Sequence, residues 1–323
     1  MVPRQGEPAM RTTVRVSARL VSILTIVATV FATILWSTTP AGAASPNKGF
    51  VLLAGDGGVF TFGVPFGGAA AGDPSHCVGD SCRSIAMTPS GAGYWILDDN
   101  TGAVYAFGTA GFYGDPATVF AHAAADLIPK PLQIIPTPSG KGYWIYGTLS
   151  GLGTVEPFGD AGFFGDTFAR YPWGTGHPHF NGHPVAMAVT ADGHGYWELW
   201  SDGGVFSYGD ATFHGSTGAI RLAQPIIGMT ATADGGGYWL YAGDGGVFAF
   251  GDAVFAGSTG AMHLNAPIVG MTRNPAGPGY WLVASDGGVF GFGGAPWMGS
   301  LPQFGLDLHS PIVAIASRGG AIA

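Results

Sequence analysis

Short apolar and alternating runs, separated by glycine-rich turns, recur along this chain, and the copy that starts at Pro225 is the clearest. Residues 226–230 form a continuous apolar run, which is typical of an innermost strand covered on both faces. Residues 237–242 predict a second strand rich in aromatic side chains, and the Asp-Gly-Gly turn after it favours a hairpin. Alternation over residues 247–250 predicts a third strand, and residues 254–257 predict a short fourth.

The same pattern returns at regular intervals. An aromatic residue follows a glycine at positions 50, 94, 143, 196, 238 and 280, and in five of these copies the motif is Gly-Tyr-Trp. The spacings are 44, 49, 53, 42 and 42 residues. A period of this length, with four short strands in each copy, is typical of a β-propeller blade.

The number of predicted first strands suggests how the repeats are arranged. The chain begins on a second strand at residues 49–52 and ends on a first strand, so the last strand is expected to complete the first blade. We therefore predict an all-β fold, one six-bladed β-propeller domain over residues 44–323. Its blades would be four-stranded, and pairing of the C-terminal strand with the N-terminal blade would close the ring. The predicted first strands are residues 84–89, 132–137, 185–190, 226–231, 268–273 and 312–317.

Residues 1–43 read as a secretory signal peptide. Four arginines precede an apolar stretch at residues 20–36, and Ala41-Gly42-Ala43 follows as a small-residue cleavage site. An uncleaved membrane anchor is the alternative, because 17 residues is near the lower limit for crossing a bilayer. We expect a secreted, extracellular protein, associated with the cell wall in one version of this hypothesis, with no transmembrane segment after cleavage.

Charge excludes some classes of partner. The predicted leader holds four basic residues and one acid, which leaves eight Lys and Arg against nineteen Asp and Glu and a formal charge of −11. Nucleic acid and anionic lipid both require a basic surface, so neither is expected as a partner. A monomer is expected. The only two cysteines, Cys77 and Cys82, predict a local disulfide outside the cell.

Residues 279–293 read Gly-Tyr-Trp-Leu-Val-Ala-Ser-Asp-Gly-Gly-Val-Phe-Gly-Phe-Gly, and residues 257–271 form a connector of matching style. These strings resemble the GYWLVASDGG-type repeats of secreted actinobacterial proteins, and the resemblance covers nearly all of the chain after the leader. Because such repeats often accompany cell-wall hydrolases or surface enzymes, the resemblance implies an accessory or adhesive role. The turns after the second strand at residues 98–102 and 148–151 depart from the Ser-Asp-Gly-Gly pattern.

The long connector at residues 166–184 is the richest candidate site. Tyr171 and Trp173 would suit stacking on a sugar ring, with nearby polar groups for the hydroxyls. A metal site is a second interpretation, since His177, His179 and His183 are spaced like transition-metal ligands. A purely structural loop rich in proline and glycine is the third. No cofactor is expected, with a divalent metal left open.

Aspartates of the Asp-Gly-Gly turns, Asp202, Asp244 and Asp286 among them, are expected on the same face as this connector. They are candidate ligand contacts, although aspartate also favours turns by bonding its own backbone. The recurring tryptophans are expected to pack between sheets, with ligand stacking as the alternative.

No catalytic motif is readable. The chain after the leader has two glutamates, Glu156 and Glu198, each the only one in its repeat. The leading hypothesis is a secreted, non-catalytic module that binds carbohydrate or a cell-envelope polymer. The alternatives are a propeller hydrolase or lyase with a metal in or near the central channel, and a cell-surface scaffold for protein partners.

Overall fold

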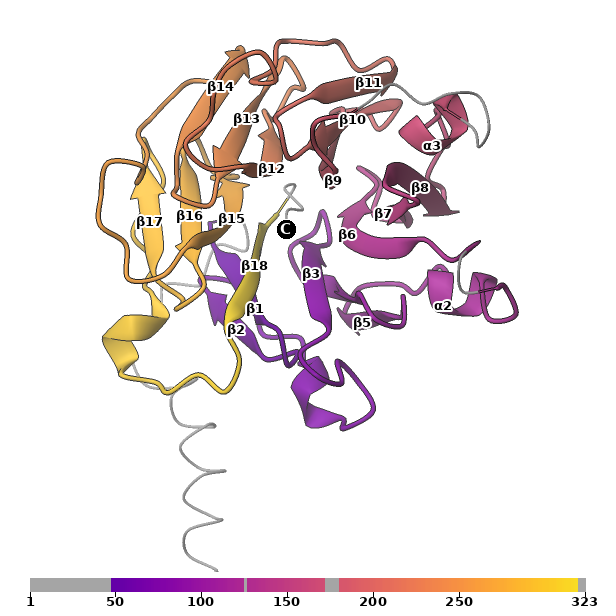
Figure 1. The fold of residues 1–323 in the computed structure, drawn as a ribbon. Coiled ribbons are helices and arrows are strands. Elements are labelled where there is room, and N and C mark those ends of the chain that lie inside the picture. The colour runs from indigo at the N-terminus through magenta and orange to yellow at the C-terminus, as the bar shows by residue number, and fades with distance from the viewer. Residues whose placement is uncertain (1–47, 125–126, 172–179, 319–323) are drawn as a thin grey trace, which may run out of the picture. The chain divides into compact units, whose positions relative to one another are not determined.

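The computed structural model describes residues 48–124, 127–171 and 180–318. The predicted leader, residues 1–43, lies outside them. All described residues belong to one compact unit, residues 44–323. The fold is all-β, with six three-stranded antiparallel sheets (Figure 1).

Sheet 1 joins the two ends of the described chain, and the other five sheets each use three consecutive strands. Sheet 1 contains β18 (Ile312–Ser317), β1 (Phe50–Ala54) and β2 (Val59–Phe62). Sheets 2 and 3 contain β3 (Cys82–Met87), β4 (Gly93–Asp98) and β5 (Val104–Gly108), then β6 (Lys130–Pro136), β7 (Gly142–Leu149) and β8 (Leu152–Gly159). Sheets 4 and 5 contain β9 (Pro184–Val189), β10 (Gly195–Trp200) and β11 (Val205–Gly209), then β12 (Ile226–Ala231), β13 (Gly237–Ala242) and β14 (Val247–Gly251). Sheet 6 contains β15 (Ile268–Arg273), β16 (Tyr280–Ala284) and β17 (Val289–Phe292).

Short helical turns interrupt the connections between sheets. They are η1 (Ala70–Gly72), α2 (Pro116–Val119), α3 (Thr167–Arg170) and η3 (Leu301–Phe304). Within the described part of the chain, no helix is long and apolar enough to cross a membrane.

The six sheets stand around a common centre in a propeller-like arrangement (Figure 1). The first strands β3, β6, β9, β12, β15 and β18 lie nearest the centre, and each contacts the next one in this order. β18 also contacts β3, so the last of these strands meets the first. As the sequence pattern predicts, β18 pairs antiparallel with β1, from Phe50 opposite Ser317 to Ala54 opposite Ile312.

Buried middle strands provide much of the core. Every residue of β4, β10, β13 and β16 is buried, and the recurring tryptophans are at most 7% exposed. Each of these tryptophan rings except Trp281 contacts the motif tyrosine of the following sheet, with centroids 5.5–6.4 Å apart. Trp281 contacts Phe50 of sheet 1 at 5.3 Å. This burial agrees with the packing interpretation of the tryptophans rather than ligand stacking.

The predicted fourth strands are not observed. Residues 254–257 and the equivalent segments of the other repeats carry no strand assignment, so each sheet has three strands. The reason lies in the hydrogen bonds of this segment. The carbonyl of Val254 accepts from the indole of Trp239, and the amide of Ala256 donates to the hydroxyl of Tyr280. Side chains therefore take the places that a ladder of backbone bonds would occupy.

Candidate functional site

Each repeat places one large apolar side chain in solvent at the same position, in the segment that follows the third strand. These six side chains are 46–63% exposed. Single exposed apolar residues are ordinary on protein surfaces, but recurrence at one position in all six repeats is not random scatter. We call these residues the exposed aromatic set. They are Phe66, Phe112, Phe163, Phe213, Phe255 and Trp297.

A buried tryptophan fixes the backbone just before five of these residues. The indole N–H of Trp197 donates to the carbonyl of Thr212 at 2.8 Å, and that of Trp281 donates to Pro296 at 2.9 Å. The same bond recurs from Trp95, Trp144 and Trp239. The carbonyl that precedes each of these five exposed aromatics is thus held from within the same repeat.

A tyrosine of the following sheet fixes the backbone just after the exposed residue. The hydroxyl of Tyr238 accepts from the amide of His214 at 3.2 Å and donates to the carbonyl of Gly215 at 2.6 Å. The pair of bonds is repeated by Tyr94, Tyr143, Tyr196 and Tyr280. Burial raises the pKa of these hydroxyls, so they remain neutral donors.

In four repeats, this arrangement presents the exposed aromatic on a backbone held from both sides. A side chain on a rigid support loses little conformational entropy when it binds a ligand. An exposed aromatic face suits the apolar C–H face of a sugar ring, and it equally suits an apolar patch of a partner. Six equivalent copies would let a polymer engage several weak contacts at once.

The long connector gives a mixed result. Trp173, His177 and His179 lie outside the described residues. Tyr171 is half-buried; its ring meets that of Phe180 at 5.5 Å, and Phe180 packs on Trp200 at 4.3 Å. The described ends of this loop therefore pack against sheet 4. A role for Tyr171 in ligand contact stays a prediction.

The third histidine of the predicted metal set is exposed and has a local partner. His183 donates its amide to the hydroxyl of Ser201 at 3.1 Å, and its Nδ1 lies 3.1 Å from the same oxygen. This double contact joins the connector to the turn after β10. A metal role for His183 stays a prediction.

Aspartates of the Asp-Gly-Gly turns stabilise their own turns. Asp202, Asp244 and Asp286 each accept, through Oδ1, the amide of the glycine two residues later, at 2.8–2.9 Å. Asp56 does the same in sheet 1. All four are half-buried. These bonds account for the recurrence of aspartate by turn geometry, and a contact with ligand stays a prediction.

Among the described residues, one group of histidine and acids brings its ligand atoms within 4.8 Å of one another: Asp192, His194 and Asp210. All three are exposed, and the hydroxyl of Thr190 donates to Asp192 at 2.9 Å. The Nδ1 of His194 lies 3.1 Å from the other oxygen of Asp192. These contacts stabilise the turn between β9 and β10 and are explained without a ligand.

The predicted disulfide is present; it joins Cys77, in the connector before β3, to Cys82, the first residue of β3. Both residues are buried and pack with Ala70 and Val51. The bridge therefore ties the first long connector to the core beneath it.

A fully buried acid is the least expected feature. Glu198 on β10 is 0% exposed, its Oε1 accepts the amide of Thr167 at 3.2 Å, and its Oε2 has no hydrogen-bond partner. The hydroxyl of Tyr146 is also buried without a partner, and a β-carbon on Gly153 would lie 2.7 Å from both of these oxygens. Burial raises the pKa of Glu198 to about 8. Its carboxyl is therefore mostly protonated at neutral pH.

Sequence analysis does not find the exposed aromatic set, although the sequence contains a signal for it. In five repeats an aromatic follows the motif tryptophan by 16 to 19 residues. The neighbouring positions are also aromatic or apolar in several repeats, so the sequence does not separate the exposed member from the packed one. No protein-family model matches the chain, and no curated protein does.

Proposed function

We propose that this chain is a secreted, non-catalytic binding module that recognises carbohydrate or a cell-envelope polymer. The observation that carries the proposal is the exposed aromatic set, one solvent-exposed aromatic per repeat, on a backbone that buried tryptophan and tyrosine hold together in four of the repeats. Polymers with repeating units suit a surface with repeating contacts, because several weak contacts combine into useful avidity.

The proposal includes a closed six-bladed propeller as the scaffold. Contact of β18 with β3, and pairing of β18 with β1, support closure. So does Gly299, whose surroundings include the ring of Phe62 in the same way that Gly257 faces Phe292 of the next sheet. The resemblance to repeats of secreted actinobacterial proteins, which implies an adhesive or accessory role, points in the same direction.

The alternative of a hydrolase with a central metal has little support among the described residues. The seventeen that line the central cavity include no Asp, Glu, His or Cys, the side chains that hold metals most often. A scaffold for protein partners would also use exposed aromatics, and the test below separates the two.

The test is binding of the purified protein to cell-wall sacculi and to a glycan array. A variant carrying Phe163→Ala, Phe213→Ala and Phe255→Ala should bind roughly ten- to a hundredfold more weakly, because three contacts of a multivalent surface are removed. Val254→Ala is the matched control, since Val254 is 72% exposed, apolar and next to Phe255. All of these variants should keep their stability within about 0.5 kcal/mol.

Saturable binding by the native protein that is lost in the triple variant and kept in Val254→Ala would support the proposal. Absence of binding to every glycan and to sacculi would overturn it and favour a protein partner. If the triple variant bound as well as the native protein, the exposed aromatic set would not be the site.

A further inference from the structure

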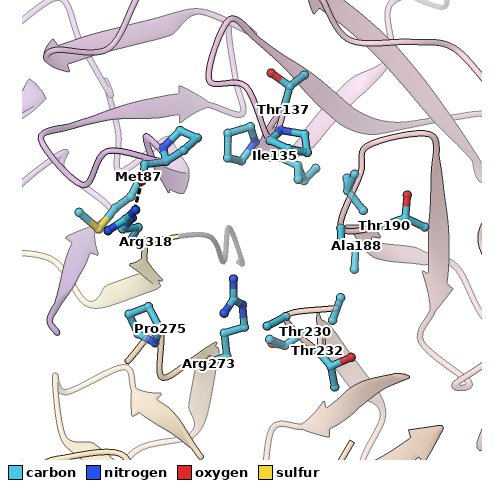
Figure 2. Close-up of a pocket in the computed structure, with 17 residues that line it drawn as sticks. Met87, Ile135, Thr137, Ala188, Thr190, Thr230, Thr232, Arg273, Pro275 and Arg318 are labelled. Carbon is cyan, nitrogen blue, oxygen red and sulfur yellow. Dashed lines mark hydrogen bonds between the residues drawn. The ribbon is translucent and has the colours of Figure 1, made fainter. Parts of the chain in front are cut away.

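A cavity of about 550 Å³ lies at the centre of the molecule, where the first strands of the six sheets end (Figure 2). Every sheet contributes to its wall, from Met87 at the end of β3 to Arg318 just after β18. The volume falls in the range of small-molecule sites and would hold a ligand of one or two sugar rings. The residues that line this cavity are separate from the exposed aromatic set, which lies in the segments that follow the third strands.

The lining is uncharged except at two places. Prolines, alanines, threonines and single Ile, Val and Met side chains form most of the wall. The two charged members are Arg273, at the end of β15, and Arg318, just after β18. None of the seventeen described lining residues is acidic. A protein whose overall formal charge is −8 thus places two cations and no anion on the wall of its central cavity.

The two arginines are held differently. Figure 2 shows Arg273 reaching from the β15 side toward the middle of the cavity, while Arg318 lies along the wall beside Met87. The Nε of Arg318 donates to the carbonyl of Pro89. Both side chains have further interactions within the chain, so a ligand would share or displace existing partners. A guanidinium has five N–H donors and keeps its charge whatever those partners are.

Electrostatics favour an anion at this place. Burial lowers the pKa of Arg273, which means that the cavity removes part of the hydration of its charge. An anion placed beside a partly dehydrated cation offsets the hydration that the cation has lost. The planar fork of a guanidinium matches the oxygens of carboxylate and phosphate groups.

We propose that the central cavity binds a small ligand of one or two sugar rings that carries an oxyanion, either a carboxylate or a phosphate, with Arg273 as the principal contact. The uncharged wall, whose threonines can bond sugar hydroxyls, would cover the rest of the ligand, and Arg318 would supply the second positive charge. The inference goes beyond the proposed function, because it concerns a different surface and a single bound molecule rather than a polymer.

The test compares three sugars that differ in one group: glucose, glucuronate and glucose 6-phosphate. Titration calorimetry on the purified protein should show saturable binding of at least one of the two anions and no binding of glucose up to about 10 mM. Binding of glucuronate alone, or of glucose 6-phosphate alone, would identify carboxylate or phosphate as the preferred group. Binding should weaken as salt is raised.

Arginine variants then locate the site. Arg273→Gln should weaken anion binding by about tenfold or more, and Arg273→Lys should retain more of it than the glutamine variant. Arg83→Gln is the matched control, since Arg83 is an exposed arginine on β3 outside the cavity lining. Comparing unfolding curves of the variants shows whether a loss of binding reflects a loss of fold.

Equal affinity for glucose and the two anions would overturn the inference, as would failure of both anions to bind the native protein. So would unchanged binding in a folded Arg273→Gln variant. None of these results affects polymer binding through the exposed aromatic set. That binding should be the same in Arg273→Gln and in the native protein. Loss of polymer binding in the triple phenylalanine variant, in turn, leaves the cavity intact.

Discussion

Two equivalent positions on neighbouring sheets hold opposite chemistry. Glu198 on β10 lies opposite Met187 and Phe206, and Leu240 on β13 lies opposite Met229 and Phe248. Both side chains are 0% exposed. Leu240 packs into an apolar cluster between sheets 4 and 5, whereas Glu198 faces Thr167 of α3 and Tyr146 of β7.

The other repeats show that an apolar residue is the rule at this position. The residues there are Leu52, Ile96, Ile145 and Leu282. Four titratable groups interact with Glu198: Tyr146 on β7, Asp166 before α3, Tyr196 on β10 and Tyr208 on β11. A buried polar group needs partners, and the boundary between sheets 3 and 4 supplies some that other boundaries lack. The comparison teaches that the one acid at this position in the six sheets lies where polar groups of the neighbouring repeat surround it.

The largest effect on stability is expected from placing a glutamate at position 240, the equivalent position on β13. Leu240→Glu should destabilise the protein by about 4 kcal/mol at pH 8, because a buried carboxylate would have no arranged partner there. Urea unfolding followed by tryptophan fluorescence measures the change. Leu240→Met is the control and should cost less than about 1.5 kcal/mol. Equal stability of the two variants would show that the boundaries between sheets do not differ in this respect.

A second, smaller effect should appear as a dependence on pH. Because the pKa of Glu198 is about 8 in the folded protein and near 4.3 when unfolded, the folded state binds the extra proton between these values. The contribution of Glu198 to the free energy of unfolding is therefore greatest below about pH 4. It falls by about 1.4 kcal/mol per pH unit as the pH rises toward 8.

Glu198→Gln removes this titration. Relative to the native protein, the variant should gain roughly 3 kcal/mol between pH 5 and pH 8, and the gain should level off above pH 8. The measurement is the difference in unfolding free energy at each pH, in which shifts of other groups cancel. A constant difference across this range would mean that Glu198 has an ordinary pKa.

The smallest effect distinguishes two buried tyrosines at equivalent positions. Tyr241 on β13 hydrogen-bonds the backbone of Met271, whereas the hydroxyl of Tyr146 has no partner. Tyr241→Phe should cost about 1 kcal/mol, and Tyr146→Phe should be within about 0.5 kcal/mol of the native protein. Thermal or urea unfolding of the two variants side by side makes the comparison. A cost for Tyr146→Phe as large as that for Tyr241→Phe would show that Tyr146 has a partner, such as a buried water shared with Glu198.

Much of the fold is readable from the repeat. The Gly-Tyr-Trp spacing and the Asp-Gly-Gly hairpins predict the middle strands and their turns, and the last apolar run predicts the pairing of β18 with β1. The outer segment was assigned wrongly as a strand. Its residues form a short apolar run like a strand, and only the three-dimensional structure shows that Tyr280 and Trp239 hold its backbone.

The sites were harder to predict, for physical reasons. Glu198 and Thr167 are 31 residues apart in different repeats, so no local pattern relates them. The exposure of Phe213 depends on neighbouring backbone that the motif side chains fix. The cavity arises where six strand ends converge, and Arg273 and Arg318 are 45 residues apart in the chain. Local patterns specify strands well, but contacts between repeats decide what faces solvent.

Sheet 1 has a consequence for how the protein is made. β1 ends at Ala54, and its partner β18 begins at Ile312, so 258 positions of synthesis separate the two. At ordinary rates of translation that interval is roughly 13 to 50 seconds. All five residues of β1 are buried in the finished sheet. A newly made chain therefore carries an apolar strand with one open edge until its last strand arrives, and that waiting period is when pairing with a foreign strand is most dangerous.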